Sequence, residues 1–437
     1  MANTWTSLLK HGSRQLPRTP QRQLRGLGQG PSLGISYGRT KARTAYNYKT
    51  VRLCSFHHNL AAMSDNPSFV LTGVENTKFE QRAVPKAGPG EVIVAIKKTG
   101  ICGSDAHYLT HGRIGDFVVT GPMVLGHESS GVIHEVGPKV TNVKPGDRVA
   151  VEPGATCGSC DACKSGHYNL CPDVVFAATP PYDGTLARYY QVPSHLVYKL
   201  PDNMSLEDGA LIEPLSVGVH SVAKLGQFQA SQSVVVFGCG PVGLLCMATA
   251  KAIGASRIIG VDIVPERLEF AKKYAATDVY LPGKPKEGES QVEYSKRNAQ
   301  EMMQKLGITD RGESAIDLVI EASGAPPSIQ TGIYVTKTGG TFVQVGMGTP
   351  NVTVDIGAIG AKELTLKGSF RYGPGAYKLG IAFVRDGKID LKPLVSHRFP
   401  FDKAAEAFEV NRKGKGPDGK SVIKVMISGP DVPAEPL

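Results

Sequence analysis

Long hydrophobic runs are missing from this chain of 437 residues. It contains no uninterrupted run of 18 apolar residues, although a helix needs about 20 to cross the hydrocarbon core of a membrane. It also lacks internal repeats, and its 51 glycines follow no collagen-like period. Hydrophobic residues at 41% and charged residues at 20% are typical of a globular chain. The sequence therefore predicts a folded protein of several domains with many tight turns and no membrane partner.

Acidic residues are absent from positions 1–62, which hold ten Lys and Arg residues; the first acid of the chain is Asp65. The net charge of +10 therefore arises in this segment, because 39 of the 49 basic residues remain beyond it, against 39 acidic residues. A body with balanced charge has no electrostatic reason to bind a phosphate backbone. We expect no nucleic-acid partner.

The acid-free segment is rich in Arg, Ser and Thr, as mitochondrial transit peptides are, and it has no apolar core typical of a secretory signal. The alternative is that Met63 is the true start and that residues 1–62 are an upstream read-through. We favour this alternative because Pro and Gly interrupt the apolar periodicity. Either way we expect a disordered extension. The expected location is the cytoplasm, or the mitochondrion if residues 1–62 act as a transit peptide.

The rhythm of the body changes twice along the chain. Between Ser68 and Pro214 it reads as short strands and turns. From about Ser231 buried strands alternate with apolar or amphipathic helices, which predicts a parallel, doubly wound sheet. After Leu366 the β-rich rhythm returns. We therefore predict an α/β chain in which a β-rich domain is split around an inserted dinucleotide-binding (Rossmann) domain. The predicted boundaries are 1–62 for the extension, 63–215 and 367–437 for the split domain, and 216–366 for the insert.

A glycine-rich turn follows the buried strand predicted at 233–237. Gly238, Gly240 and Gly243 have the G-x-G-x-x-G spacing of a turn that lets the backbone approach a pyrophosphate and lets helix and strand pack closely. Asp262, at the end of the next strand, is placed to bind the ribose hydroxyls and to repel a 2′-phosphate. This predicts NAD rather than NADP, although Arg267 could pair with a phosphate.

Four cysteines have the spacing C-x2-C-x2-C-x7-C, a compact pattern that can close a tetrahedral, structural zinc site. Disulfides are disfavoured in a chain without a secretory signal, and unligated core cysteines are the remaining alternative. These cysteines are Cys157, Cys160, Cys163 and Cys171.

A second set of metal-ligating side chains is scattered along the β-rich part. Cys102 lies in a Gly-rich turn, His127 and Glu128 follow as G-H-E, and Glu213 lies at the presumed domain junction. One thiolate, one imidazole and one or two carboxylates leave a coordination position open, which is typical of a catalytic zinc site. Each residue also has an ordinary structural interpretation.

These motifs in this order resemble the zinc-containing medium-chain dehydrogenase/reductase family over about 67–430. The stretches 176–185 and 367–373 resemble its polyol dehydrogenases, and xylitol dehydrogenases (D-xylulose reductases) more than sorbitol or L-arabinitol dehydrogenases. The resemblance implies a GroES-like catalytic domain, one catalytic and one structural zinc ion, NAD and often a homotetramer. It also implies that the cysteine lobe has no part in catalysis, because some relatives lack it.

The resemblance further implies roles for individual residues. Cys102, His127 and Glu128 match catalytic zinc ligands, and Glu213 matches a carboxylate that holds the zinc-bound water or ligates in its place. Ser104 and His107 match a proton relay, although His107 could be an ordinary surface histidine. The positions that match substrate contacts are Tyr108, Glu213, Arg371 and Tyr372. The further positions that match NAD contacts are Val242, Asp262, Arg267, Val345, Gly346, Met347, Ser369, Phe370 and Arg371.

The predicted reaction is the reversible, NAD-linked oxidation of xylitol to D-xylulose, as in pentose catabolism. A secondary alcohol holds its proton up to a pKa of about 16, and zinc can bring bound water to about 7. Arg371, Tyr108 and Tyr372 offer polar partners that a long apolar alcohol would not use. Sorbitol or L-arabinitol oxidation, and a catalytically inactive structural member, are the alternatives.

Overall fold

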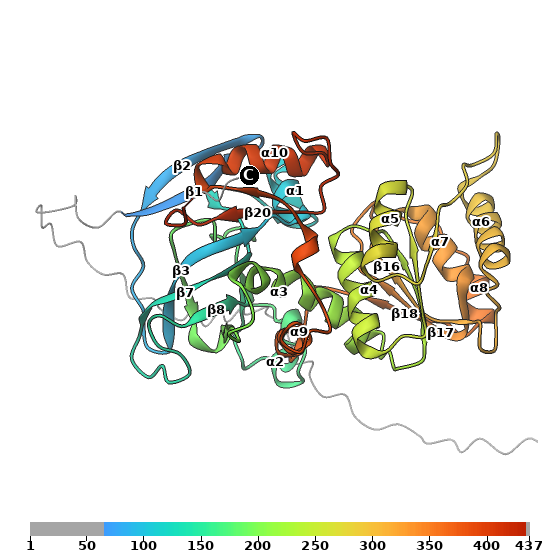
Figure 1. The fold of residues 1–437 in the computed structure, drawn as a ribbon, viewed down its shortest axis with the longest axis horizontal. Coiled ribbons are helices and arrows are strands. Elements are labelled where there is room, and N and C mark those ends of the chain that lie inside the picture. The colour runs from blue at the N-terminus through green and yellow to red at the C-terminus, as the bar shows by residue number, and fades with distance from the viewer. Residues whose placement is uncertain (1–64, 434–437) are drawn as a thin grey trace, which may run out of the picture. The chain divides into compact units, whose positions relative to one another are not determined.

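The computed structural model describes residues 65–433 of the chain, and the predicted disordered extension, 1–62, lies outside these residues. In the described part, no helix is both long and apolar enough to cross a bilayer. The chain forms one β-rich region and one region of alternating strands and helices (Figure 1).

The β-rich region is built around a seven-stranded sheet with the order β12-β8-β7-β3-β20-β19, and β11 pairs with β3 outside this path. Val92, Val94 and Val149 lie in its core because alternate strand residues face the same side. A three-stranded sheet, β2-β1-β6, packs with α10 around Phe69 and Phe408. The strands of these sheets are β1 (Asn66–Gly73), β2 (Asn76–Arg82), β3 (Glu91–Gly100), β6 (Met123–Val124), β7 (Glu128–Val136), β8 (Arg148–Val151), β11 (Tyr189–Pro193), β12 (Val197–Lys199), β19 (Val395–Phe399) and β20 (Lys424–Ser428).

Strand β20, near the C-terminus, connects the two sequence segments of the β-rich region. It pairs antiparallel with β3, with Met426 opposite Gly100, and it pairs parallel with β19. Residues near position 100 and near position 425 therefore share one sheet, with the α/β region inserted between them in the sequence. This confirms the predicted fold class, a β-rich domain split around a parallel α/β domain.

The inserted region has a six-stranded parallel sheet with the order β15-β14-β13-β16-β17-β18. Val234 and Val236 face α4 and α5, whereas Val235 and Phe237 face α6 and α7, so helices cover both faces of the sheet (Figure 1). The order reverses between β13 and β16, and α/β sheets bind ligands beside the carboxyl ends of strands at such a point. The elements are β13 (Ser233–Phe237), α4 (Pro241–Ile253), β14 (Arg257–Val261), α5 (Pro265–Tyr274), β15 (Asp278–Tyr280), α6 (Gln291–Leu306), β16 (Ile316–Glu321), α7 (Pro326–Val335), β17 (Thr336–Gln344), α8 (Ile356–Ala361) and β18 (Thr365–Gly368).

Helix α3 (Leu206–Val219) links the two regions. Its N-terminus is fixed by a capping box in which the Ser205 hydroxyl accepts a hydrogen bond from the Asp208 N–H and the Asp208 carboxylate accepts one from the Ser205 N–H. Most of its residues are buried, and a π-helical turn, His220–Leu225, leads on towards β13.

The sequence patterns predicted the two kinds of region but missed several helices in the β-rich part. The strand predicted at 233–237 and the alternation of strands and helices after it are confirmed. The stretch from Ser68 to Pro214 was expected to hold only strands and turns, and that expectation was wrong for three helices: α1 (Gly103–His111), the short α2 (Asp161–Lys164) and α3. Pro214 lies inside α3 although it lacks an N–H, and the burial of the helix outweighs that loss. The remaining elements are β4 (Arg113–Ile114), β5 (Phe117–Val118), β9 (Gly154–Ala155), α2 (Asp161–Lys164), β10 (Val175–Phe176), α9 (Ala376–Arg385) and α10 (Ala404–Lys413).

His220 makes the stability of the fold depend on pH. Its Nδ1 accepts a hydrogen bond from the Gly373 N–H at 3.3 Å, which ties the end of α3 to the returning chain. Burial, with Lys224 and His167 nearby, lowers the pKa of His220 to about 4. The unfolded chain therefore binds a proton between about pH 6.5 and pH 4 that the folded chain does not bind, and stability falls as the pH is lowered through this window.

We predict that His220→Gln removes this part of the pH dependence. Urea unfolding at pH 7 and at pH 4.5 measures it: the wild-type protein should lose up to about 3 kcal/mol more than the variant between the two values. An equal loss in both proteins would show that His220 is not the group responsible.

Candidate active site

Three predicted metal ligands meet where β3, β7 and β20 lie side by side. Cys102 caps the N-terminus of α1 directly after β3, and His127 and Glu128 lie at the start of β7. Their ligand atoms all lie within 4.8 Å of one another, and His127 and Glu128 are buried. A thiolate, an imidazole and a carboxylate at these separations fit a zinc ion.

Asp105 orients this cluster, and the sequence analysis gave it no role. Its carboxylate accepts hydrogen bonds from the N–H groups of Cys102, at 3.2 Å, and Gly126, at 3.0 Å, and one oxygen lies 3.4 Å from Nδ1 of His127. Burial lowers the pKa of His127, but the charge of Asp105 and the neighbouring Cys102 thiol raise it well above the usual value. The imidazole therefore lies in a strongly negative environment, which also favours a metal cation.

Lys424 pairs with Glu128 at the base of the cluster. Its ammonium donates to both carboxylate oxygens, at 2.7 and 2.8 Å, and to the Ile101 carbonyl at 3.0 Å. Both side chains are buried. Burial lowers the pKa of the Lys424 ammonium, but the charges of Glu128 and Cys102 raise it by more, so the pKa lies above its usual value. The negative charge that Glu128 adds to the metal cluster is thus balanced by the Lys424 ammonium.

Glu213 is not one of the three residues of this cluster. It lies buried on α3, and burial raises the pKa of its carboxyl to about 7, with His127 opposing and Glu128 reinforcing the shift. Ser104 is half-buried and His107 is exposed, with the His107 ring beside that of His111. Within residues 65–433 no hydrogen bond joins Ser104 to His107.

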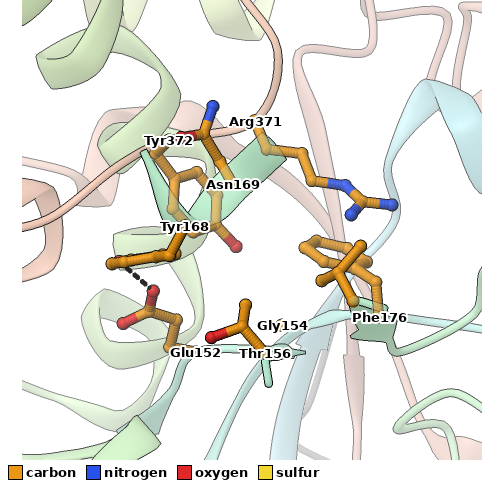
Figure 2. Close-up of a pocket in the computed structure, with 9 residues that line it drawn as sticks. Glu152, Gly154, Thr156, Tyr168, Asn169, Phe176, Arg371 and Tyr372 are labelled. Carbon is orange, nitrogen blue, oxygen red and sulfur yellow. Dashed lines mark hydrogen bonds between the residues drawn. The ribbon is translucent and has the colours of Figure 1, made fainter. Parts of the chain in front are cut away.

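Two of the predicted substrate residues, Arg371 and Tyr372, line one pocket with Phe176. The ring of Phe176 lies 5.8 Å from the ring of His127. The guanidinium of Arg371 lies 3.8 Å from the same ring (Figure 2). Tyr108 is buried, and burial raises its pKa although Thr179 and Arg371 act in the opposite direction. Arg371 also donates to the Thr179 hydroxyl at 3.5 Å. Phe176 and Thr179 lie in the stretch 176–185 that resembles polyol dehydrogenases, but no role was predicted for either residue.

Several buried polar atoms at this site have no hydrogen-bond partner. Among the described residues four such side-chain atoms occur, and three of them are Nδ1 of His127, Nη1 of Arg371 and the hydroxyl of Tyr372. Burial and the charge of Glu213 also raise the pKa of Tyr372 well above its usual value. Because unpaired buried polar groups are costly, the Arg371 and Tyr372 atoms indicate a ligand that supplies oxygen or nitrogen atoms, whereas Nδ1 of His127 faces the Asp105 carboxylate at 3.4 Å.

The glycine turn after β13 has the form expected for dinucleotide binding. Gly238 has a φ of +90°, and a Cβ on Gly243 would lie 1.8 Å from the Gly238 carbonyl oxygen. A Cβ on Gly240 would meet no atom within 4 Å, so this position faces open space at the N-terminus of α4. The turn therefore leaves room for a pyrophosphate beside the N–H groups of the helix.

Asp262 directly follows β14 beside this turn. One of its oxygens accepts from the Cys239 N–H at 2.7 Å and the other from the Val264 N–H at 2.9 Å. These bonds fix the carboxylate at the edge of the turn, where a ribose would lie. Arg267 is half-buried on α5, and Val242 is half-buried in the first turn of α4.

The remaining predicted cofactor residues follow β17 and β18. Glu321, a buried carboxylate with no predicted role, holds this region: its backbone carbonyl accepts from the N–H groups of Val345 and Gly346 at 2.8 Å each. Met347 is exposed, and Ser369 donates its N–H to Gln344 at 2.8 Å. Phe370 is also exposed, and its ring stacks on the Arg371 guanidinium at 4.7 Å.

The four cysteines of the predicted structural site also gather into one cluster, with their sulfur atoms within 4.8 Å of one another. The Cys171 and Cys157 sulfurs lie 3.6 Å apart, and a tetrahedral zinc ion would set its sulfur ligands about 3.8 Å apart. All seven cysteines in the described part of the chain are free thiols. The donor set and its spacing fit a closed zinc site.

Comparison with known proteins agrees with these features. The alcohol dehydrogenase GroES-like domain matches residues 88–202, and the zinc-binding dehydrogenase domain matches residues 241–386. The chain is 53% identical over 365 residues to a protein of Aspergillus clavatus named probable D-xylulose reductase A, covering 83% of this chain and 97% of that protein. It is 52% identical over 369 residues to D-xylulose reductase A of Aspergillus niger, covering 84% and 98%.

A solved structure, an alcohol dehydrogenase of Escherichia coli CFT073 complexed with NADH, superposes with a TM-score of 0.73. It is 27% identical and covers 84% of this chain and 99% of its own. With the split β-rich domain, the two cysteine-containing clusters and the glycine turn, these relatives show that the chain belongs to the zinc-containing medium-chain dehydrogenase/reductase family.

Proposed function

We propose that this protein is a zinc- and NAD-dependent polyol dehydrogenase that interconverts xylitol and D-xylulose. The observation that carries the proposal is the gathering of unpartnered polar atoms of Arg371 and Tyr372 around the Cys102–His127–Glu128 cluster. A substrate with hydroxyl groups along its whole length would pair these atoms, whereas a simple apolar alcohol would leave them unsatisfied. The names of the fungal relatives point to the same substrate pair.

In the proposed reaction, a secondary alcohol of xylitol would lose a hydride from carbon and its hydroxyl proton to solvent, and NAD held at the glycine turn would supply the hydride acceptor. The products are D-xylulose, NADH and a proton. A zinc ion held by Cys102, His127 and Glu128 would supply the positive charge that lowers the pKa of the reacting hydroxyl towards neutrality.

The chain itself binds and orients the two reactants. Arg371 would donate hydrogen bonds, and Tyr372 would donate or accept them, at hydroxyls away from the reacting carbon, and Tyr108 and Phe176 would exclude water from it. Asp105 holds the loops that carry Cys102 and His127. The relay through Ser104 and His107 stays a prediction.

We assign NAD to the glycine turn and its neighbours. Gly238, Gly240 and Gly243 would receive the pyrophosphate, and Asp262 the adenosine ribose. The remaining proposed contacts are Val242, Arg267, Val345, Gly346, Met347, Ser369, Phe370 and Arg371. We likewise assign a second, structural zinc ion to Cys157, Cys160, Cys163 and Cys171. We propose that residues 63–215 and 367–437 form the catalytic domain, which includes this zinc site, and that residues 216–366 form the NAD-binding domain.

We further propose a homotetramer in the cytoplasm, or in the mitochondrion if residues 1–62 direct import. Strand β18 supports association: within the described residues it pairs with β17 alone, and Leu366 on it is exposed. Light scattering measures the subunit number, and imaging of tagged chains with and without residues 1–62 decides the location.

A polyol panel tests the proposed function directly. With NAD, kcat/KM for xylitol should exceed that for sorbitol, L-arabinitol and threonine, and chelation should abolish turnover until zinc is restored. Cys102→Ser should bind one zinc ion per chain rather than two and lose at least about 10³-fold in kcat. Cys246→Ala is the control, because this buried cysteine lies in the core of α4 outside both clusters. Full activity in Cys102→Ser would contradict the assignment, as would turnover unaffected by complete loss of zinc.

Cofactor choice is predicted to depend on the charge of Asp262. Asp262→Asn keeps the size of the side chain but removes the charge that repels a 2′-phosphate, so the ratio of kcat/KM with NAD to that with NADP should fall at least about tenfold. Glu266→Gln removes an equal charge from an exposed position on α5 and should leave the ratio unchanged. A ratio that is insensitive to Asp262→Asn would refute this role.

A further inference from the structure

We propose that the four-cysteine lobe, residues 157–171, shapes the polyol site, and that Asn169 within it is a positioning residue for Arg371. This deepens the proposed function and rests on it. The family resemblance implied a lobe without a part in catalysis. The contacts between Asn169 and the segment 370–373 argue for a direct connection.

Asn169 lies in a 3-10 turn, Tyr168–Leu170, between the third and fourth cysteines. Its side chain is buried, and its Nδ2 donates a hydrogen bond to the Phe370 carbonyl at 2.9 Å, between residues 201 positions apart in the sequence. Its Oδ1 lies 3.5 Å from the place a Cβ on Gly373 would take. The amide therefore binds one end of the segment Phe370–Gly373 and lies near the other.

The segment 370–373 needs such support because of its backbone. Arg371 has a φ of +55°, in the left-handed region that residues with a Cβ rarely adopt. A conformation of this kind persists only where the surroundings hold it. Asn169 holds the segment from the lobe, and the imidazole of His220 holds it from the end of α3 by accepting from the Gly373 N–H.

The side chains that the segment carries are those proposed to bind the polyol. The Arg371 guanidinium lies over Phe176, and its Nη1 is buried without a partner, as is the neighbouring Tyr372 hydroxyl. Figure 2 shows Asn169 with Arg371, Tyr372 and Phe176 around one small pocket, which Thr156 of the lobe region also lines. A shift of the Phe370 carbonyl would change where the guanidinium lies.

The lobe has its own anchor on the β-rich sheet. The Tyr168 hydroxyl donates to Glu152 at 2.5 Å (Figure 2). The Tyr198 hydroxyl donates to the other oxygen of the same carboxylate at 2.6 Å. Burial raises the pKa of Glu152, which the two hydroxyls oppose. Residue 169 is thus fixed relative to the sheet on one side and bound to the segment 370–373 on the other.

The test compares Asn169→Ala with Asn66→Ala. Asn66 is an equally buried amide whose side chain also hydrogen-bonds to backbone, at Tyr189. It lies on β1 in the three-stranded sheet and is distant in sequence from the segment 370–373. Both variants should lower the melting temperature. Only Asn169→Ala should raise the KM for xylitol, by about tenfold, with kcat changed much less and two zinc ions per chain retained.

A double-mutant cycle separates positioning from a general structural effect. If Asn169 acts through Arg371, Asn169→Ala should lower kcat/KM in the wild-type background but change it little in the Arg371→Leu background. Equal KM values in Asn169→Ala and Asn66→Ala, or additive losses in the double variant, would overturn the proposal.

Hydrogen exchange gives a readout that does not need turnover. Amides of residues 366–375 should exchange faster in Asn169→Ala than in Asn66→Ala or in the unaltered protein. Unchanged exchange at residues 366–375 would refute the positioning role of Asn169. Failure of the wild-type protein to oxidise any polyol would instead refute the proposed function, and the exchange result would still decide whether Asn169 positions the segment.

Discussion

The whole site depends on the pairing of β3 with β7 and β20. Gly100 at the end of β3 lies opposite Glu128 on β7 and opposite Met426 on β20. A Cβ on Gly100 would lie 2.2 Å from an Oε2 atom of Glu128, so only glycine leaves room for that carboxylate. The same registers place Cys102, one residue beyond Ile101, beside Glu128 and Lys424. One set of backbone hydrogen bonds thereby builds a metal cluster from three distant parts of the chain.

Buried charge is the cost of this arrangement, and the chain compensates it locally. Lys424 neutralises Glu128, and Asp105 faces His127. Breaking such a pair would leave an uncompensated charge in the core. The unpaired atoms that face no buried charge lie instead on Arg371 and Tyr372. Compensated charges therefore form the base of the site, and unpaired polar atoms form the surface that would meet the substrate.

The parts of the site that are local in sequence could be predicted, and those that depend on long-range contacts could not. The turn from Gly238 to Gly243 lies within six residues, so its spacing alone indicates its geometry. Lys424 reads as an ordinary basic residue in a strand, because its partner Glu128 is 296 positions away. Asn169 and Glu321 carry no motif, and only the fold shows which backbone groups they bind.

Helix α3 shows the same limit for the fold. The structure shows a capping box of Ser205 and Asp208 at the start of α3 and Pro214 inside it, and the burial of the helix against both regions could not be read from local pattern. Glu213 was placed at a domain junction, and the structure has it on this helix.

X-ray absorption at the zinc edge of the purified, catalytically active protein tests the central claim most directly. The account predicts two zinc ions per chain. One is bound by the four sulfur atoms of the lobe, and the other by one sulfur atom, from Cys102, together with nitrogen and oxygen atoms. A single zinc ion surrounded by four sulfur atoms in a fully active enzyme would contradict it.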